Sequence, residues 1–368
     1  MTDSKLITPP EAFVKVSRID TDVHPAPRSL AELREYMDEP WRSMPAQAFT
    51  SGNSVIRAPG GGFRGDTIGQ QEEDTPGSDP ELAYQQLLVD AGVDFAVLMP
   101  LVKPSPNPHL EAAAAAAMNR WQVATWLGAY NSHGRYRGSI CVSLDDPESA
   151  CREIEEWAAH PYFSQVRVNT YSDVPLGDPK YHPMFETAEK NGIPVALHFS
   201  KATGQHFLTP SGFPKSYFEW HITTSANYSA QLTSMIFGGV FDKYPELVMV
   251  FIEGGVSWLI PMVWRLDNIW RATKGLHPTC KRLPSEYIRK NVRLTTQPVD
   301  DPADKTALYR LYDAVDAESI LMFSTDYPHW DYDNPLQPVF DQMPEHMRER
   351  IMWKNAAEVY SLPDVRAA

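Results

Sequence analysis

The chain has 368 residues, of which 43% are hydrophobic and 22% charged, and its 47 acidic and 33 basic side chains give a formal net charge of −14. This composition is typical of a globular protein with a sizeable core, and the acidic balance without basic runs argues against a nucleic-acid or anionic-membrane partner. No stretch approaches about 20 uninterrupted apolar residues, so we expect no membrane span. The polar residues 1–11 lack the apolar core of a secretory signal, and the three scattered cysteines fit free thiols, so we expect a cytoplasmic protein.

Short apolar segments alternate with helical segments along most of the chain. The predicted strands are residues 16–24, 94–100, 136–143, 165–169, 194–198, 247–253, 291–296 and 320–326. The predicted helices are residues 81–92, 110–130, 146–159, 183–191, 224–244 and 301–313. Eight strands with intervening helices predict an α/β fold with one domain over residues 1–368, a closed (β/α)8 TIM barrel. A doubly wound sheet of six or seven strands is the competing interpretation.

Residues 25–80 do not follow this rhythm and form a long inserted segment after the first strand. Their second half is rich in glycine and acidic residues. Because this segment would project from the barrel face that carries active sites, we expect a lid or a subunit-contact loop. Arg57 and Arg64 could meet a substrate carboxylate there, or could be solvated loop charges. Barrels of this size often pair, so we expect a homo-oligomer or a hetero-oligomer with a related barrel subunit.

Polar residues interrupt the first strand where it ends, in "IDTDVHP". Asp20, Asp22 and His24 share one side of the strand, because side chains alternate with period two. Three titratable groups on a buried strand are costly unless something compensates their charge. A divalent cation would do so, and the oxygen and imidazole donors of Asp22 and His24 suit zinc, iron or manganese.

Two further strands end in the same kinds of ligand. His198 closes the fifth strand after "PVAL", and Asp326 closes the eighth in "STDYPHWD". Taken alone, His198 could be a packed structural histidine and Asp326 could hold its loop. Because the carboxyl ends of all barrel strands meet at one face, we expect Asp22, His24, His198 and Asp326 to bind one or two divalent metal ions there.

These positions and several longer motifs resemble the amidohydrolase superfamily, in the amidohydrolase-related branch that also contains decarboxylases. The motifs are "GVDFAVLMP", "YHPMFETAEKNGIPVALH", "FGGVFDKYPELVMVFIEGGVSWL", "LMFSTDYPHWD" and "WKNAAEVY", so the resemblance covers nearly the whole chain. The family pattern has two histidines one residue apart after the first strand, and Asp22 replaces the first of them. The resemblance implies that His198 and Asp326 bind metal and that Asp326 can take a proton from an attacking water.

The chain departs from the family pattern at two strand ends. The fourth strand, "QVRVN", carries Arg167 and Asn169 and lacks the lysine that bridges two metals in some members. The sixth strand ends in Glu253, where the resemblance implies a histidine acid or base in the decarboxylases. Glu253 could be a metal ligand, a general acid or base, or a carboxylate bound to the backbone amides of the glycines that follow it.

Two loop histidines complete the candidate site. His221, in "YFEWHITT", and His329, after Asp326, could be metal ligands or acid–base groups, or could make only structural hydrogen bonds. Trp258, Tyr327 and Trp330 could line a pocket or could equally be packing residues. The candidate catalytic residues are therefore Asp326, Glu253 and His221, and the candidate metal ligands are Asp22, His24, His198, Asp326, His221, Glu253 and His329.

The leading functional hypothesis is a metal-dependent hydrolase of a small molecule. Metal-activated water would attack a carbonyl-type centre, with Asp326 accepting its proton and Glu253 or His221 protonating the leaving group. The alternatives are a metal-dependent decarboxylase or hydratase, and an O2-dependent di-iron or manganese–iron monooxygenase subunit similar to 2-aminoisobutyrate hydroxylase. A metal-bearing but catalytically idle partner subunit is a fourth possibility.

Overall fold

The computed structural model describes residues 18–45, 62–69, 74–103, 105–170, 172–199 and 214–362. Eight parallel strands pair in chain order: β1 (Ile19–Val23), β2 (Phe95–Leu98), β3 (Tyr136–Cys141), β4 (Phe163–Asn169), β5 (Val195–His198), β6 (Met249–Ile252), β7 (Val292–Thr295) and β8 (Leu321–Met322). The Asp326 amide donates to the Asp22 carbonyl and Val23 bridges Tyr327, so the segment after β8 returns to β1 and closes the barrel. The predicted (β/α)8 barrel is therefore confirmed, and the doubly wound alternative is wrong.

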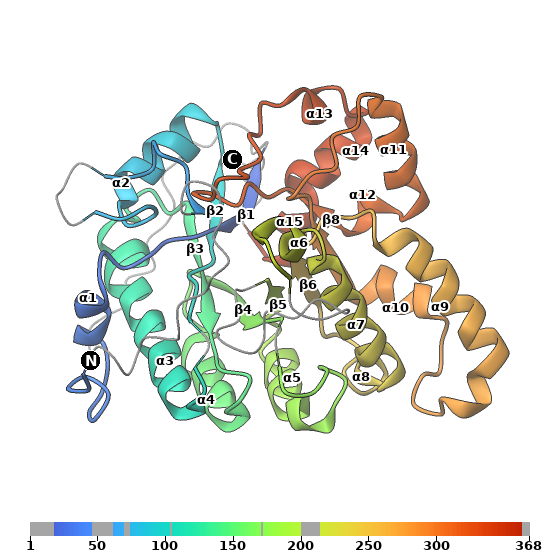
Figure 1. Cartoon of the computed structure of the whole chain (residues 1–368), viewed down its shortest axis with the longest axis horizontal. Helices are drawn as coiled ribbons and strands as arrows, with labels where there is room; N and C mark the ends of the chain where they lie inside the picture. The colour runs from blue at the N-terminus through green and yellow to red at the C-terminus, as the bar shows by residue number, and fades with distance from the viewer. Residues whose placement is uncertain are drawn as a thin grey trace.

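Helices surround the strands, which gather in the middle of the molecule (Figure 1). The main ones are α3 (Pro108–Ala124), α4 (Pro147–Trp157), α5 (His182–Lys190), α7 (Thr224–Phe237), α9 (Leu259–Thr273), α10 (Pro284–Asn291) and α11 (Lys305–Ala314). The shorter ones are α1 (Leu30–Glu35), α2 (Pro80–Ala83), α6 (Tyr217–His221), α8 (Val240–Lys243), α12 (Ala317–Ile320), α13 (Pro338–Asp341), α14 (Glu345–Glu349) and α15 (Asn355–Val359). Among these helices none combines the length and apolar character needed to cross a lipid bilayer.

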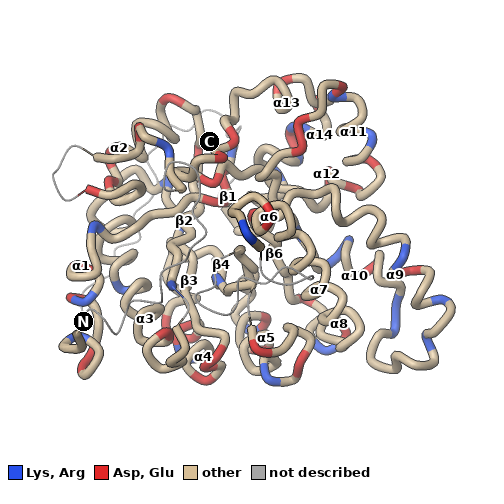
Figure 2. Tube along the Cα trace, in the orientation of Figure 1, with Lys and Arg blue, Asp and Glu red and all other residues tan. Residues whose placement is uncertain are grey.

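Several helices begin at an Asx–Pro pair. Asp79, Asn107 and Asp146 each accept a hydrogen bond from a first-turn amide, and a proline follows each of them. The carboxylate or amide oxygen satisfies an amide that has no partner within the helix, and proline already has the helical φ. Acidic and basic residues are interspersed along the outer helices (Figure 2).

The structure differs from the predicted elements at several places. The helix predicted over 224–244 is two helices, α7 and α8, because Gly239 has a φ of 78° and ends the first. The strand predicted over 320–326 is paired as a strand only at Leu321–Met322, since the Ser324 amide bonds the Thr296 hydroxyl and the Thr325 amide bonds the Asp20 carboxylate. The inserted segment also contains α1, which the sequence reading did not predict.

The core has two parts, separated by the barrel wall. A larger cluster fills the space between strands and helices, and a smaller one fills the barrel and includes Ile19, Phe95 and Met322. Trp353 and Tyr360, from the last helices, join the smaller cluster. These C-terminal residues cover the end of the barrel where the strands begin, so the opposite end is the one left for a site.

Candidate functional site

The candidate site lies at the carboxyl ends of four strands. Asp22 is in β1 with His24 just beyond it, His198 is the last residue of β5, and Glu253 directly follows β6. Asp326 lies beyond β8, on the segment that pairs with β1. The sequence argument that strand ends gather these residues at one face therefore agrees with the structure.

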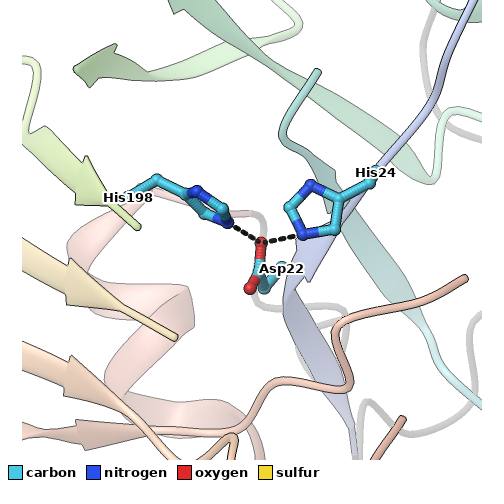
Figure 3. Close-up of side chains that lie close together, drawn as sticks. All are labelled: Asp22, His24 and His198. Carbon is cyan, nitrogen blue, oxygen red and sulfur yellow. Dashed lines mark ion pairs between the residues drawn. The ribbon is translucent and has the colours of Figure 1, made fainter. Parts of the chain in front are cut away.

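Asp22, His24 and His198 form a tight buried cluster (Figure 3). The Asp22 Oδ1 atom lies 3.2 Å from His24 Nε2 and 3.6 Å from His198 Nε2. Two ligands about 2.1 Å from a shared ion, at angles of about 90–110°, lie about 3.0–3.4 Å from one another. The distance to His24 falls within this range and the distance to His198 slightly exceeds it, and all three ligand atoms lie within 4.8 Å of one another.

The hydrogen bonding of this cluster also fits a cation. Within the described ranges, neither Asp22 carboxylate oxygen and neither His198 ring nitrogen has a hydrogen-bond partner, although both side chains are buried. Buried polar atoms are normally paired, and an isolated buried carboxylate is costly. His24 Nδ1 lies 2.7 Å from the Met99 carbonyl, which needs a donor, so Nδ1 carries a proton and Nε2 points at the Asp22 and Asp326 carboxylates. One carboxylate and two imidazoles suit manganese, iron or zinc.

The pKa shifts of the two histidines run in opposite directions. Burial lowers the pKa of His198 well below its ordinary value, and the positive charges of His24 and Arg167 lower it further. Burial also acts to lower the pKa of His24, but the charge and contacts of Asp22 and Asp326 outweigh it and raise that pKa well above its ordinary value. His198 is therefore neutral, and neutral imidazole is the form that binds metal.

Asp326 joins this cluster to His329. Its Oδ1 atom lies 2.7 Å from His24 Nε2 and 2.6 Å from His329 Nδ1. Burial acts to raise the pKa of Asp326, but His329 and His24 hold it below its ordinary value. The sequence reading missed Gln297, whose amide nitrogen lies 3.3 Å from the other Asp326 oxygen. Asp326 is thus an ionised carboxylate, and with His24 and His329 it forms a further set of three donors that could hold an ion.

A second group of possible ligands adjoins the first. His221 Nε2 lies 3.1 Å from Asp331 Oδ2, and Glu253 completes a set of three donors that could hold an ion. Glu253 Oε2 is also 3.3 Å from His198 Nε2, so the two groups touch. The sequence reading did not single out Asp331, although it lies in the "STDYPHWD" motif, two residues after His329.

Two acidic residues of the site have a strained backbone. The φ angles of Glu253 and Asp326 are 62° and 63°, in the left-handed region that residues with a Cβ rarely adopt. Burial raises the pKa of Glu253 well above its ordinary value, and the charges of Asp326 and Asp331 add to this. Such strain persists where the surrounding structure enforces it, and it concentrates at functional sites.

The interior face of β4 is polar, although it has no lysine. Arg167 is fully buried, and none of its guanidinium nitrogens bonds to any residue that the structure describes. Asn169, opposite His198 in the strand register, likewise has an unpaired side-chain oxygen. Burial lowers the pKa of Arg167, and Asp22 is among the groups that counter this. A cation thus lies below the acidic cluster in the barrel.

Asp20 differs from the other two polar residues of β1. It accepts hydrogen bonds from the Thr325 hydroxyl at 2.6 Å and from the Thr325 amide at 3.0 Å. Its role is to tie β1 to the segment after β8, which holds Asp326 in place.

A cavity of about 330 Å³ opens onto the two groups of ligands. His24, His198, Glu253 and His329 line its inner end, and its walls are mostly apolar. The aromatic wall residues are Phe63, Phe199, Tyr217 and Trp220. Of the two roles left open for Trp258, Tyr327 and Trp330, the contacts favour packing: none of them lines this cavity, and Tyr327 Oη donates to Gln86 Oε1 at 2.8 Å.

The inserted segment reaches the cavity. Phe63 forms a β-bridge with His329, and its ring stacks on the imidazole at 5.3 Å. Arg64 pairs with Asp66 at 2.6 Å and does not line the cavity, and Arg57 lies outside the described residues. The lid or contact role of residues 25–80 stays a prediction.

Cys141, Cys151 and Cys280 are free thiols, as expected.

Comparison with known proteins identifies the family. The amidohydrolase family model matches residues 19–362, so the chain belongs to that family. The gamma-resorcylate decarboxylase of Polaromonas sp. is 28% identical over 245 residues, which cover 62% of this chain and 71% of the relative. The 2-amino-3-carboxymuconate-6-semialdehyde decarboxylase of Dictyostelium discoideum is 25% identical over 282 residues, which cover 74% of this chain and 72% of the relative.

A solved structure has the same fold. It is the 5-carboxyvanillate decarboxylase of Novosphingobium aromaticivorans, complexed with manganese and 4-hydroxy-3-methoxy-5-nitrobenzoic acid. The TM-score is 0.68 at 18% identity, and the match covers 97% of this chain and 99% of that chain.

Proposed function

We propose, from this family membership, that the protein is a metal-dependent decarboxylase of a small aromatic or conjugated carboxylic acid. The observation that carries the proposal is the buried Asp22, His24 and His198 cluster, with its unpaired oxygens and nitrogens, at the inner end of an aromatic-walled cavity. The relatives named above are decarboxylases of such acids, and one of them binds manganese. They favour this alternative over the hydrolase that the sequence reading placed first.

The contacts of Asp326 also favour decarboxylation over hydrolysis. A hydrolase needs a base that can take a proton from the attacking water. Asp326 Oδ1 already lies within hydrogen-bond distance of two imidazoles, at 2.7 and 2.6 Å, and Gln297 approaches its second oxygen. We infer that Asp326 orients His24 and His329 and does not act as the base.

The metal cluster and the apolar walls of the cavity have different roles in the reaction. A divalent ion held by Asp22, His24 and His198 would supply positive charge that attracts the substrate carboxylate. Phe63, Phe199 and the other apolar wall residues hold the ring and exclude water from it. The bond between the ring carbon and the carboxylate breaks, CO2 leaves, and the ring carbon takes one proton.

We propose Glu253 as the group that delivers this proton. It lines the cavity at the end of β6, the strand end at which the resemblance implies a histidine with this role. The test is the variant Glu253→Gln, which keeps size and polarity. It should bind a nitro analogue of a hydroxybenzoate as tightly as the wild type and lose about a hundredfold or more of CO2 release. Equal loss of binding and turnover would make Glu253 a ligand instead.

A second function is supported by one observation, the adjoining group of His221, Glu253 and Asp331. Two ions, in these two groups, would resemble the dinuclear centre expected of a monooxygenase subunit, with the carboxylate-rich ligation that iron and manganese prefer. Elemental analysis that finds two iron or manganese ions per chain, together with O2 consumption, would favour it. One ion per chain, with His221→Ala leaving the metal content unchanged, would count against it.

A further inference from the structure

One basic residue stands out in the cavity. Lys103 is the only lysine or arginine among the residues that line it in the described part of the chain. It follows β2 on a segment that is well anchored, since the Met99 amide donates to the Val23 carbonyl at 2.6 Å and Val102 is only 3% exposed. The ammonium group is thus attached to a fixed part of the cavity wall, although the side chain itself is exposed.

Lys103 differs from other basic residues that follow the first two strands. Arg28 pairs with Asp74 at 2.9 Å, and Arg64 pairs with Asp66 at 2.6 Å. Lys103 makes no ion pair or hydrogen bond with any residue the structure describes. A cation that lines a cavity and has no partner is available to a ligand.

The cavity is lined by charges of both signs. The inner end carries the carboxylates of Asp22, Glu253, Asp326 and Asp331, and the whole chain has a net charge of −14. A ligand with two negative groups would be repelled unless a local cation met the group that the metal cluster does not hold. The mostly apolar walls of the cavity favour a flat hydrocarbon ring that joins the two groups.

We propose that Lys103 binds a second acidic group of the substrate, distinct from the group that the metal cluster binds. The substrate is then a dianionic aromatic or conjugated acid, and Lys103 is a specificity-determining residue. This inference rests on the proposed function, because it takes the first acidic group to be the carboxylate that is lost.

The test compares two ligands that differ by one carboxylate, 2-hydroxybenzoate and 4-hydroxybenzene-1,3-dicarboxylate. Their binding to manganese-loaded protein is measured by titration calorimetry at fixed ionic strength. Lys103→Met removes the charge and keeps the length, and Lys103→Arg keeps the charge. Lys274→Met, on an exposed turn outside the cavity, is the matched control for net charge.

We expect Lys103→Met to weaken binding of the dicarboxylate about fivefold and of the monocarboxylate less than about twofold. Lys103→Arg should stay within about threefold of the wild type, and Lys274→Met should leave both affinities unchanged. Equal effects on the two ligands, no effect on either, or no binding of the dicarboxylate by the wild type would overturn the inference.

The same titrations separate this inference from the proposed function. Lys103-dependent binding of the dicarboxylate without CO2 release would leave the inference standing and count against decarboxylation. CO2 release from monocarboxylates that is indifferent to Lys103 would support decarboxylation and overturn the inference.

Discussion

Asp22→Asn should stabilise the metal-free protein while it abolishes metal binding. The Asp22 carboxylate is fully buried, its oxygens have no hydrogen bond within the described ranges, and only His24, at 3.2 Å, partly compensates its charge. An asparagine amide at the same place could donate to His198 Nε2, whose distance from Asp22 Oδ1 is 3.6 Å. The substitution also loses the attraction between Asp22 and His24, but Asp326 lies closer to His24, at 2.7 Å, and keeps it paired.

The expected gain in the free energy of unfolding follows from the cost of an unsatisfied buried group, about 1–3 kcal/mol. A chain of 368 residues has an unfolding entropy of about 0.8 kcal/mol/K, from about 2.1 cal/mol/K per residue. The melting temperature in chelator should therefore rise by about 1–4 °C. With metal at a hundred times its Kd, the wild type should gain about 2.7 kcal/mol, or about 3–4 °C, and Asp22→Asn should gain nothing.

Differential scanning calorimetry with chelator and with manganese gives all four melting temperatures. We expect Asp22→Asn to melt above the wild type in chelator. When manganese is added, this difference in melting temperature should shrink or change sign. If Asp22→Asn melts below the wild type in chelator and its melting temperature rises as much with manganese, the buried Asp22 charge does not destabilise the protein and Asp22 is not a ligand.

Three further predictions use other parts of the fold. Gly254→Ala should lower turnover and cost about 1–3 kcal/mol, because its Cβ would lie 2.4 Å from the Tyr228 ring and displace the end of β6; steady-state kinetics and calorimetry check it. Tyr360→Phe should cost about 1 kcal/mol without changing the metal content, because it removes the 2.8 Å bond to Gln165; denaturant unfolding and elemental analysis check it. His133→Asn should flatten the fall in melting temperature below pH 6.5. Burial and then the Arg135 charge lower the pKa of His133 to about 4. The unfolded chain therefore binds the His133 proton at a higher pH than the folded chain does, and the folded state loses stability as the pH falls.

Each of these predictions has an outcome that contradicts it. Gly275→Ala, with nothing within 4 Å of its Cβ, is the control for Gly254→Ala, and equal behaviour of the two would refute the clash. Loss of metal from Tyr360→Phe would mean that the closed end of the barrel supports the site. An unchanged pH profile in His133→Asn would show that other groups set the acid stability.

The barrel and the first ligand group could be predicted because both depend on local patterns. Apolar strands give the sheet order, and polar residues at strand ends, such as Asp22 and His198, must meet at one barrel face. The contacts of loop residues depend on tertiary packing, which period and spacing do not encode. Asp331 and Gln297 were missed for this reason, and so was the role of Phe63, which reaches the cavity from the inserted segment.

A motif that is easy to recognise in the sequence does not show which of its side chains face the cavity. Tyr327 and Trp330 belong to a distinctive motif beside Asp326, yet neither lines the cavity: Tyr327 bonds Gln86, and Trp330 packs behind the cavity residue Tyr217. Arg167 is visible in the sequence as a charged residue in a strand, but its complete burial without a hydrogen-bond partner among the described residues is evident only in three dimensions.

The most direct test is a product analysis in D2O with chelated and manganese-reconstituted protein. A panel of hydroxylated benzoates and conjugated dicarboxylates is incubated with each, and CO2 and the ring product are quantified. We predict one CO2 for each ring product, deuterium at the carbon that bore the carboxylate, and activity only in the reconstituted sample. Equal activity in chelated protein, or metal-dependent hydrolysis of esters or amides without CO2 from any acid, would contradict this prediction.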